Sequence, residues 1–118
     1  MKKLLCLVIF ALGCTPSTID EYRREGESLA IAIASELRKV ETKADLEACG
    51  PKIKKKLDKL TDLMIASQKI AIDAPKEVTY GSQQLKKEQM RIYSIEGGKE
   101  TFEAICSEAL QKIQLNLR

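Results

Sequence analysis

Cysteine and lysine are the residue types in this chain whose number and spacing point to specific chemistry. The four cysteines are Cys6, Cys14, Cys49 and Cys106, and the 118 residues include no histidine. The commonest general base and metal ligand is therefore missing, and the cysteine spacing matches no zinc-binding pattern. The sequence also lacks P-loop, G-x-G-x-x-G and G-x-S-x-G motifs. We therefore expect that the protein is not an enzyme and has no metal or cofactor.

A dense cluster of lysines occurs at residues 51–60, which read PKIKKKLDKL. On a helix, Lys54 points away from the side that the other lysines share, and Lys56 lies at the edge of that side. A solvated surface is the ordinary role of such a cluster, and a contact site for an anionic partner is the alternative. The candidate partner-binding residues are Lys52, Lys55, Lys56 and Lys59.

The N-terminus has the features of a segment that directs export. Lys2 and Lys3 precede ten residues without a charge, Leu4 to Gly13, which is about half of a membrane span. A positive start, a short apolar centre and a small residue before the break are typical of a secretory signal peptide. We expect residues 1–13 to be removed and to take no part in the fold. An uncleaved N-terminal helix is the alternative.

The residues around the break, Phe10-Ala11-Leu12-Gly13-Cys14, resemble the lipobox of bacterial lipoproteins. The resemblance covers the signal region only, and Ala11 stands where leucine is commoner. It implies that Cys14 becomes the first residue of the mature chain and carries a diacylglycerol thioether, usually with an amide-linked third acyl chain. Two or more chains anchor a protein stably to a membrane. Residues 14–17 then form a lipidated tether, and ordinary secretion after cleavage at Gly13 is the alternative.

The cysteine count favours lipidation and predicts a disulfide. Removal of the signal peptide loses Cys6, and the three remaining cysteines would leave one thiol unpaired in an exported protein. If Cys14 carries lipid, Cys49 and Cys106 remain as a pair, 57 positions apart. A disulfide that closes a loop of this length stabilises a domain by about 4 kcal/mol in the chain-entropy model, and exporting compartments are usually oxidising. Two buried thiols are the alternative.

Composition indicates a single small helical domain. Removal of residues 1–13 leaves 105 residues, which is the length of one domain. The chain is 44% hydrophobic but only 4% aromatic, so the core must consist mainly of Leu, Ile and Ala, as in helical bundles. Without Lys2 and Lys3 the formal charge falls from +3 to about +1, which creates no overall field to attract nucleic acid.

Apolar residues recur at helical spacing along residues 18–118. They predict a first helix over 18–48, opened by a capping box of Thr18 and Glu21 and closed by Gly50-Pro51. Further helices are predicted over 51–72, from 82 to about 96, and over 99–117. The expected fold is all-α, a small antiparallel bundle of four helices stapled by one disulfide, and three helices with a long last one are the alternative.

Together these features predict a lipid-anchored protein of the bacterial cell envelope that binds a partner. The expected anchor site is a bacterial membrane, the outer membrane in a Gram-negative cell, and the expected partner is a protein or another anionic envelope component. A pilotin-like secretion accessory is one alternative, by analogy of architecture alone. A small inhibitor or immunity lipoprotein that presents residues 74–82 is another. A third is a coiled-coil spacer made by homo-oligomers of residues 18–48.

Overall fold

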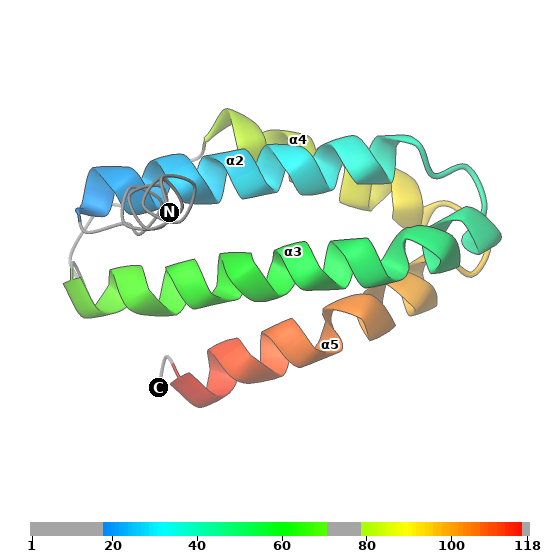
Figure 1. Ribbon diagram of the computed structural model, residues 1–118. Helices are drawn as coiled ribbons and strands as arrows, with labels where there is room; N and C mark the ends of the chain where they lie inside the picture. The colour runs from blue at the N-terminus through cyan, green and yellow to red at the C-terminus, as the bar shows by residue number, and fades with distance from the viewer. Residues whose placement is uncertain (1–17, 71–78, 117–118) are drawn as a thin grey trace, which may run out of the picture.

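The computed structural model describes residues 18–70 and 79–116, and this part of the chain folds into four α-helices (Figure 1). No strand occurs in the described residues, so the predicted all-α class and the choice of four helices are confirmed. The predicted signal peptide, the tether with Cys14 and residues 74–78 of the candidate inhibitory loop lie outside the described residues. The helices are α2 (Ile19–Arg38), α3 (Lys43–Ile70), α4 (Tyr80–Tyr93) and α5 (Gly98–Asn116).

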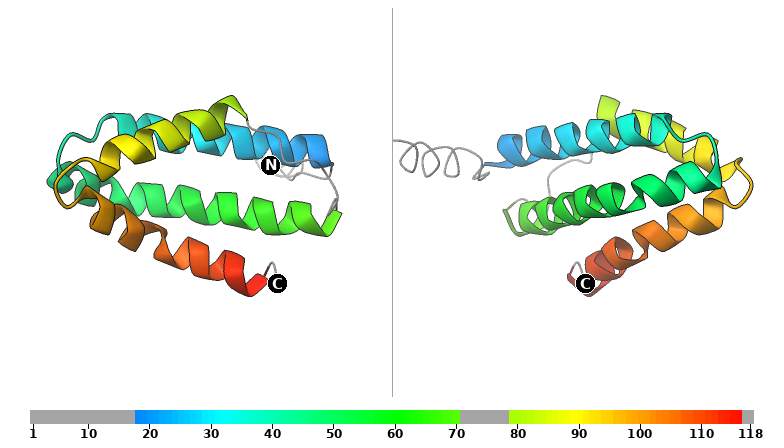
Figure 2. Two further views of the ribbon diagram at one scale, coloured as in Figure 1. Left: turned by 180° about the vertical axis from the view of Figure 1, so that it is seen from behind. Right: turned by 45° about the vertical axis from the view of Figure 1, so that its right-hand side comes forward.

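Successive helices run in opposite directions. The turns at residues 39–42 and 94–97 lie together at one end of the bundle, here called the turn end, and α2 begins at the opposite end (Figures 1 and 2). α2 packs against both α3 and α4, and α3 also packs against α5, whereas α4 and α5 contact each other much less. The four helices therefore form an open array in the order α4, α2, α3, α5.

The apolar core is concentrated towards the turn end. All four helices and the turn at 39–42 contribute to one cluster of buried side chains, and Phe102 is its single aromatic residue. The ring of Phe102 meets that of Tyr93 edge to face, with 6.2 Å between the ring centroids. The members of the cluster are Ile33, Leu37, Val40, Leu46, Ile53, Ile92 and Phe102.

The predicted single helix over residues 18–48 is wrong, because α2 ends at Arg38 and α3 begins at Lys43. A capping box starts α3. The amide of Asp45 donates to Thr42 Oγ1 at 3.2 Å, and Asp45 Oδ2 accepts from the amides of Thr42 (3.3 Å) and Glu41 (3.1 Å). These bonds satisfy amides that a helix start leaves without intrahelical partners, so the chain turns here.

Gly50 and Pro51, which were predicted to separate two helices, lie inside α3. A methyl group on Gly50 would lie 3.4 Å from Cδ1 of Ile105, at the limit of ordinary van der Waals contact, so α5 packs directly on α3 here. Pro51 is the ninth residue of α3 and is exposed. Its ring removes one helical hydrogen bond, and α3 nevertheless continues to Ile70.

The starts of α4 and α5 are set by local signals. Thr79 and Ser82 form a capping box, in which the amide of each donates to the hydroxyl of the other at 3.1 Å. α4 therefore starts at Tyr80, two residues before the predicted position. Between α4 and α5, Gly97 has a φ of +75°, which glycine adopts without steric cost, so the predicted turn is confirmed.

Replacement of Pro51 by alanine is expected to stabilise the protein. Proline in a helix interior costs about 3 kcal/mol relative to alanine, and Pro51 is exposed, so the change removes little buried surface. The free energy of unfolding, measured by urea denaturation, should rise by about 1 to 3 kcal/mol. Lys55→Ala, an exposed change one turn further along α3, serves as the control and should have little effect. A loss of stability in Pro51→Ala would contradict a continuous α3.

Candidate functional site

The four candidate lysines lie on one side of α3, and we call them the lysine stripe (Lys52, Lys55, Lys56 and Lys59). Lys52, Lys55 and Lys59 are exposed and Lys56 is half-buried, while Ile53 on the opposite side is fully buried. Lys54 points away from the other lysines, as predicted, and faces α5, where its ammonium lies 3.0 Å from Glu108 Oε1. Within the described residues, no ion pair involves a member of the stripe.

The lysine stripe lies on the flank of the bundle. Lys52 and Lys59 are the tenth and seventeenth residues of α3, which places them about 14 and 24 Å along the helix from its first residue, at about 1.5 Å per residue. A helix over 51–72 that starts at Pro51, as the sequence predicted, would place these lysines at the beginning of that helix. That placement is wrong, because α3 begins eight residues before Pro51.

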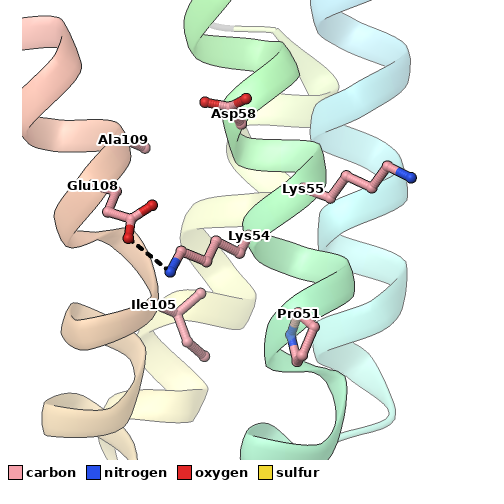
Figure 3. Close-up of a pocket in the computed structure, with 7 residues that line it drawn as sticks. All are labelled: Pro51, Lys54, Lys55, Asp58, Ile105, Glu108 and Ala109. Atoms are coloured by element: carbon pink, nitrogen blue, oxygen red, sulfur yellow. Dashed lines mark ion pairs between the residues drawn. The ribbon is translucent and has the colours of Figure 1, made fainter.

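An open groove of about 360 Å³ runs between α3 and α5 (Figure 3). Two of the residues along it, Ile105 and Ala109, are half-buried, and the other five are exposed. The ion pair of Lys54 and Glu108 crosses the groove, and Lys55 points to the other side of α3. The sequence analysis missed this groove, since it depends on how two distant segments pack. The lining residues are Pro51, Lys54, Lys55, Asp58, Ile105, Glu108 and Ala109.

A smaller hollow of about 260 Å³ lies between α2 and α3 near the turn end. It brings the carboxylates of Glu36 and Asp45 to the same surface as the ammonium groups of Lys39 and Lys52, and Cys49 lies in its wall. Because charges of both signs share this hollow, the positive field around Lys52 is reduced.

The structure contains Cys49 and Cys106 as free thiols, so the predicted disulfide is not formed in it. Both residues pack against the core cluster, from the neighbouring helices α3 and α5. Burial raises the pKa of the Cys49 thiol, and it raises that of Cys106 to about 11. Because the thiolate is the reactive form, neither residue has the properties of a catalytic nucleophile.

Glu88 on α4 is the one charged residue among the buried side chains of the described residues, at 4% exposed. Its carboxylate accepts a hydrogen bond from Arg91 Nε at 2.9 Å and lies 3.6 Å from Nε of Arg38 on α2. The hydrogen bond from Arg91 lowers the pKa of Glu88, against the opposing effect of burial. Glu88 is therefore a buried, ionised group that is already fully occupied by two arginines.

Arg91 also joins α4 to the end of α2. Its NH1 and NH2 groups donate to the carbonyl oxygens of Val40 and Leu37 at 2.8 and 2.6 Å. Carbonyls at the end of a helix lack intrahelical partners and carry partial negative charge, so a guanidinium there is stabilising. Glu88 and Arg91 thus form a structural network. Their spacing, Glu-x-x-Arg, is common on helix surfaces and did not identify them in the sequence.

The described residues provide little else that could carry chemistry or span a bilayer. They include no group of three or more Cys, Asp or Glu side chains placed to hold a metal ion. None of the described helices combines the length and the apolar character that a transmembrane segment needs. Comparisons of the chain with protein-family models, with curated proteins and with solved structures gave no match.

Loss of the Glu88 carboxylate should change both the stability and its pH dependence. Removal of a hydrogen-bonded charge costs about 1.5 to 3 kcal/mol, so Glu88→Gln should lower the free energy of unfolding at pH 7 by that amount. The pKa of Glu88 in the folded protein lies below its ordinary value of 4.5. The contribution of Glu88 to the free energy of unfolding is therefore complete at pH values above 4.5, and it is lost as the pH falls through the pKa of the folded protein.

Urea denaturation at several pH values tests this expectation. Between about pH 5 and pH 3 the wild-type protein should lose more stability than Glu88→Gln, because the unfolded carboxyl binds its proton first. Glu103→Gln is the control, since Glu103 is exposed and has no ion pair in the described part of the chain. Parallel pH profiles for the wild type and Glu88→Gln would contradict the role assigned to Glu88.

Proposed function

We propose that this protein is a lipid-anchored binding module of the bacterial cell envelope, and that the lysine stripe contacts an anionic partner. The observation that carries the proposal is the absence of any ion pair at the stripe within the described residues, although α3 carries acidic residues as well. Five other cations of the bundle do form ion pairs. They are Arg38, Lys43, Lys54, Arg91 and Lys112.

The ion pairs between helices use cations outside the stripe. Lys54 and Lys112 connect α3 with α5, and Arg38 and Arg91 connect α2 with α4. The exposed lysines of the stripe make no comparable connection, and exposed charges contribute little to folding. Their side chains are therefore available to a partner without loss of a contact that holds the bundle together.

The anchor comes from the sequence, which places the lipid on Cys14, five residues before α2 begins at Ile19. Four intervening residues span at most about 14 Å, so the start of α2 stays near the membrane. α3 returns towards that end, and Lys59 and Lys52 precede its last residue by 11 and 18 positions. With α3 upright, the stripe is roughly 17 to 27 Å from that end of the helix.

The distance between the stripe and the anchoring membrane limits which partners can contact it. The Debye length at physiological ionic strength is about 8 Å, so anionic lipids of the anchoring membrane attract the stripe only weakly. An anionic protein, or another envelope component that reaches the flank of the bundle, is the better candidate. Export to the cell envelope, and to the outer membrane in a Gram-negative cell, belongs to the same proposal.

Lipidation is tested by the intact mass of the protein extracted from membranes. The mature chain should begin at Cys14 and should carry the additional mass of a diacylglyceryl group and an amide-linked acyl chain. Cys14→Ser should abolish the acyl mass and leave the protein either uncleaved or in the soluble fraction. A mature chain that starts at another residue and is recovered without acyl groups would overturn this part of the proposal.

The Cys49–Cys106 disulfide is part of the same proposal, because it requires an oxidising compartment. Its support is the cysteine count and the packing of both residues against one core cluster on neighbouring helices. A disulfide needs sulfur atoms about 2.05 Å apart, so its formation requires a local movement where α3 meets α5. The intact mass measured without a reductant should be two hydrogen masses below that of the reduced protein. Full alkylation of both thiols in the native exported protein would show that the bond is absent.

Charge reversal tests the binding role. We expect Lys52→Glu, Lys55→Glu and Lys59→Glu together to lower recovery of the cross-linked partner from native envelopes at least tenfold. Partner recovery by the wild type should also fall between low and moderate salt, since the contact is electrostatic. The free energy of unfolding should change by less than about 0.5 kcal/mol per site, as for ordinary surface positions.

The matched control reverses three exposed lysines elsewhere, Lys69, Lys86 and Lys87. This control should keep wild-type recovery, because none of the three belongs to the stripe. Unchanged recovery in the stripe variant would show that these lysines are only solvated. The nature of the recovered partner separates the alternatives: a secretion channel subunit supports the pilotin-like role, and a soluble enzyme supports the inhibitor role.

A further inference from the structure

We propose that the last part of α5 rests on the lipid surface that carries the anchor, so that the bundle leans on this helix. The contact is made by four exposed residues, here called the distal face of α5: Leu110, Gln111, Gln114 and Leu115. This inference rests on the proposed function, since lipid on Cys14 holds the protein at the membrane. It adds the orientation of the bundle and the surface that touches the bilayer.

The distal face exposes two large apolar side chains to solvent. Leu110 is 54% exposed and Leu115 is 69% exposed. Because successive helical residues are about 100° apart, these leucines and the two glutamines between them fall within an arc of about 140° on one side of the helix. The half-buried Ala109 lies on the opposite side, towards α3. The leucines therefore point away from the bundle.

The number of charges on α5 falls from the turn end to the other end of the bundle. The first six residues of the helix include three exposed charged side chains, Lys99, Glu100 and Glu103. Beyond Glu108, the single charged residue in the described part of α5 is Lys112, which pairs with two aspartates of α3. The distal face itself carries no charge that would have to leave water. Such a face suits the boundary between lipid headgroups and acyl chains, where amphipathic helices bury their apolar side.

The distal face lies at the end of the bundle nearest to the lipid anchor. α5 ends where α2 begins and α3 ends (Figures 1 and 2). The four residues between Cys14 and Ile19, where α2 begins, span at most about 14 Å, so this end stays near the membrane. Because the tether keeps the lipid surface at a high effective concentration, a small apolar contact is sufficient to orient the bundle.

The start of α2 offers no comparable surface at the same end. Its first seven residues include four exposed charged side chains, and their removal from water would be costly. The bundle therefore leans towards α5, while the start of α2 remains in the aqueous layer on its tether. The four charged residues are Asp20, Arg23, Arg24 and Glu25.

This orientation turns the lysine stripe away from the lipid. Lys54 faces α5, whereas Lys55 of the stripe points to the other side of α3 (Figure 3). A bundle that leans on α5 therefore presents the stripe on the side that faces away from the membrane, where an envelope partner can reach it.

Tryptophan fluorescence tests the contact, because the chain has no tryptophan of its own. The reporter is Gln114→Trp, on the distal face between the two leucines. The matched control is Met90→Trp, since Met90 is 65% exposed and lies on α4, which packs on α2 and not on α3. Each mature lipoprotein is reconstituted at physiological salt in phosphatidylcholine vesicles, with and without bromine on the acyl chains. Brominated lipid should lower the emission of Gln114→Trp at least twofold and leave that of Met90→Trp nearly unchanged.

Further changes in the Gln114→Trp protein test the role of the leucines. Leu110→Gln with Leu115→Gln should abolish quenching by brominated lipid, because the distal face then has no apolar side chain to bury. Met90→Gln removes an equally exposed apolar side chain from α4 and should leave the quenching unchanged. Since all these positions are exposed, the variants should fold, and circular dichroism verifies this.

Flotation of the vesicles separates the possible failures. A mature protein that does not float with the vesicles overturns the anchor and this orientation together. Three results overturn the orientation alone in a protein that does float: equal emission of Gln114→Trp in both lipids, quenching that survives loss of both leucines, and emission that depends only on the protein-to-lipid ratio. The last result would show that a second copy covers the distal face. Partner recovery that depends on the stripe would still support the proposed function in these three cases.

Discussion

The guanidinium of Arg91 joins α4 to the end of α2 and to the turn after it. It donates to the carbonyl of Leu37 in the last turn of α2, to that of Val40 in the turn that follows, and to the buried carboxylate of Glu88 on its own helix. Each of these groups would be costly to bury without a partner. These bonds fix α4 against the end of α2, next to the turn at 39–42, where the capping box of Thr42 and Asp45 starts α3.

The position at which α3 begins sets the direction in which each of its charged side chains points. With Ile53 in the core, Lys54 faces α5 and pairs with Glu108, while Lys55 and Lys59 face solvent. One sequence of adjacent lysines is thus divided between a structural contact and an exposed surface. The division follows from the angle of about 100° between successive helical residues.

Helical periodicity was sufficient to predict the fold class, the number of helices and the exposed side of α3. It failed at the first helix boundary, because Gly50-Pro51 is a strong signal for the end of a helix. The sequence also contains the capping box Thr42-Lys43-Ala44-Asp45, which starts α3. Gly50 lies against Ile105 of α5, and no local pattern reveals such a contact. The groove was unpredictable for the same reason, since its two walls are about 50 positions apart.

α5 is the least embedded helix of the bundle. Its buried residues, Gly98 and Phe102, lie in its first turn and a half, and further along Leu110 and Leu115 are 54% and 69% exposed. Beyond Phe102, exposed ion pairs and half-buried side chains connect it to α3. Its distal amides should therefore exchange with solvent hydrogen by local opening, well before the molecule unfolds as a whole. Local opening of this part of α5 costs less free energy than unfolding of the whole molecule. A ligand bound against it would slow the exchange of its amide hydrogens.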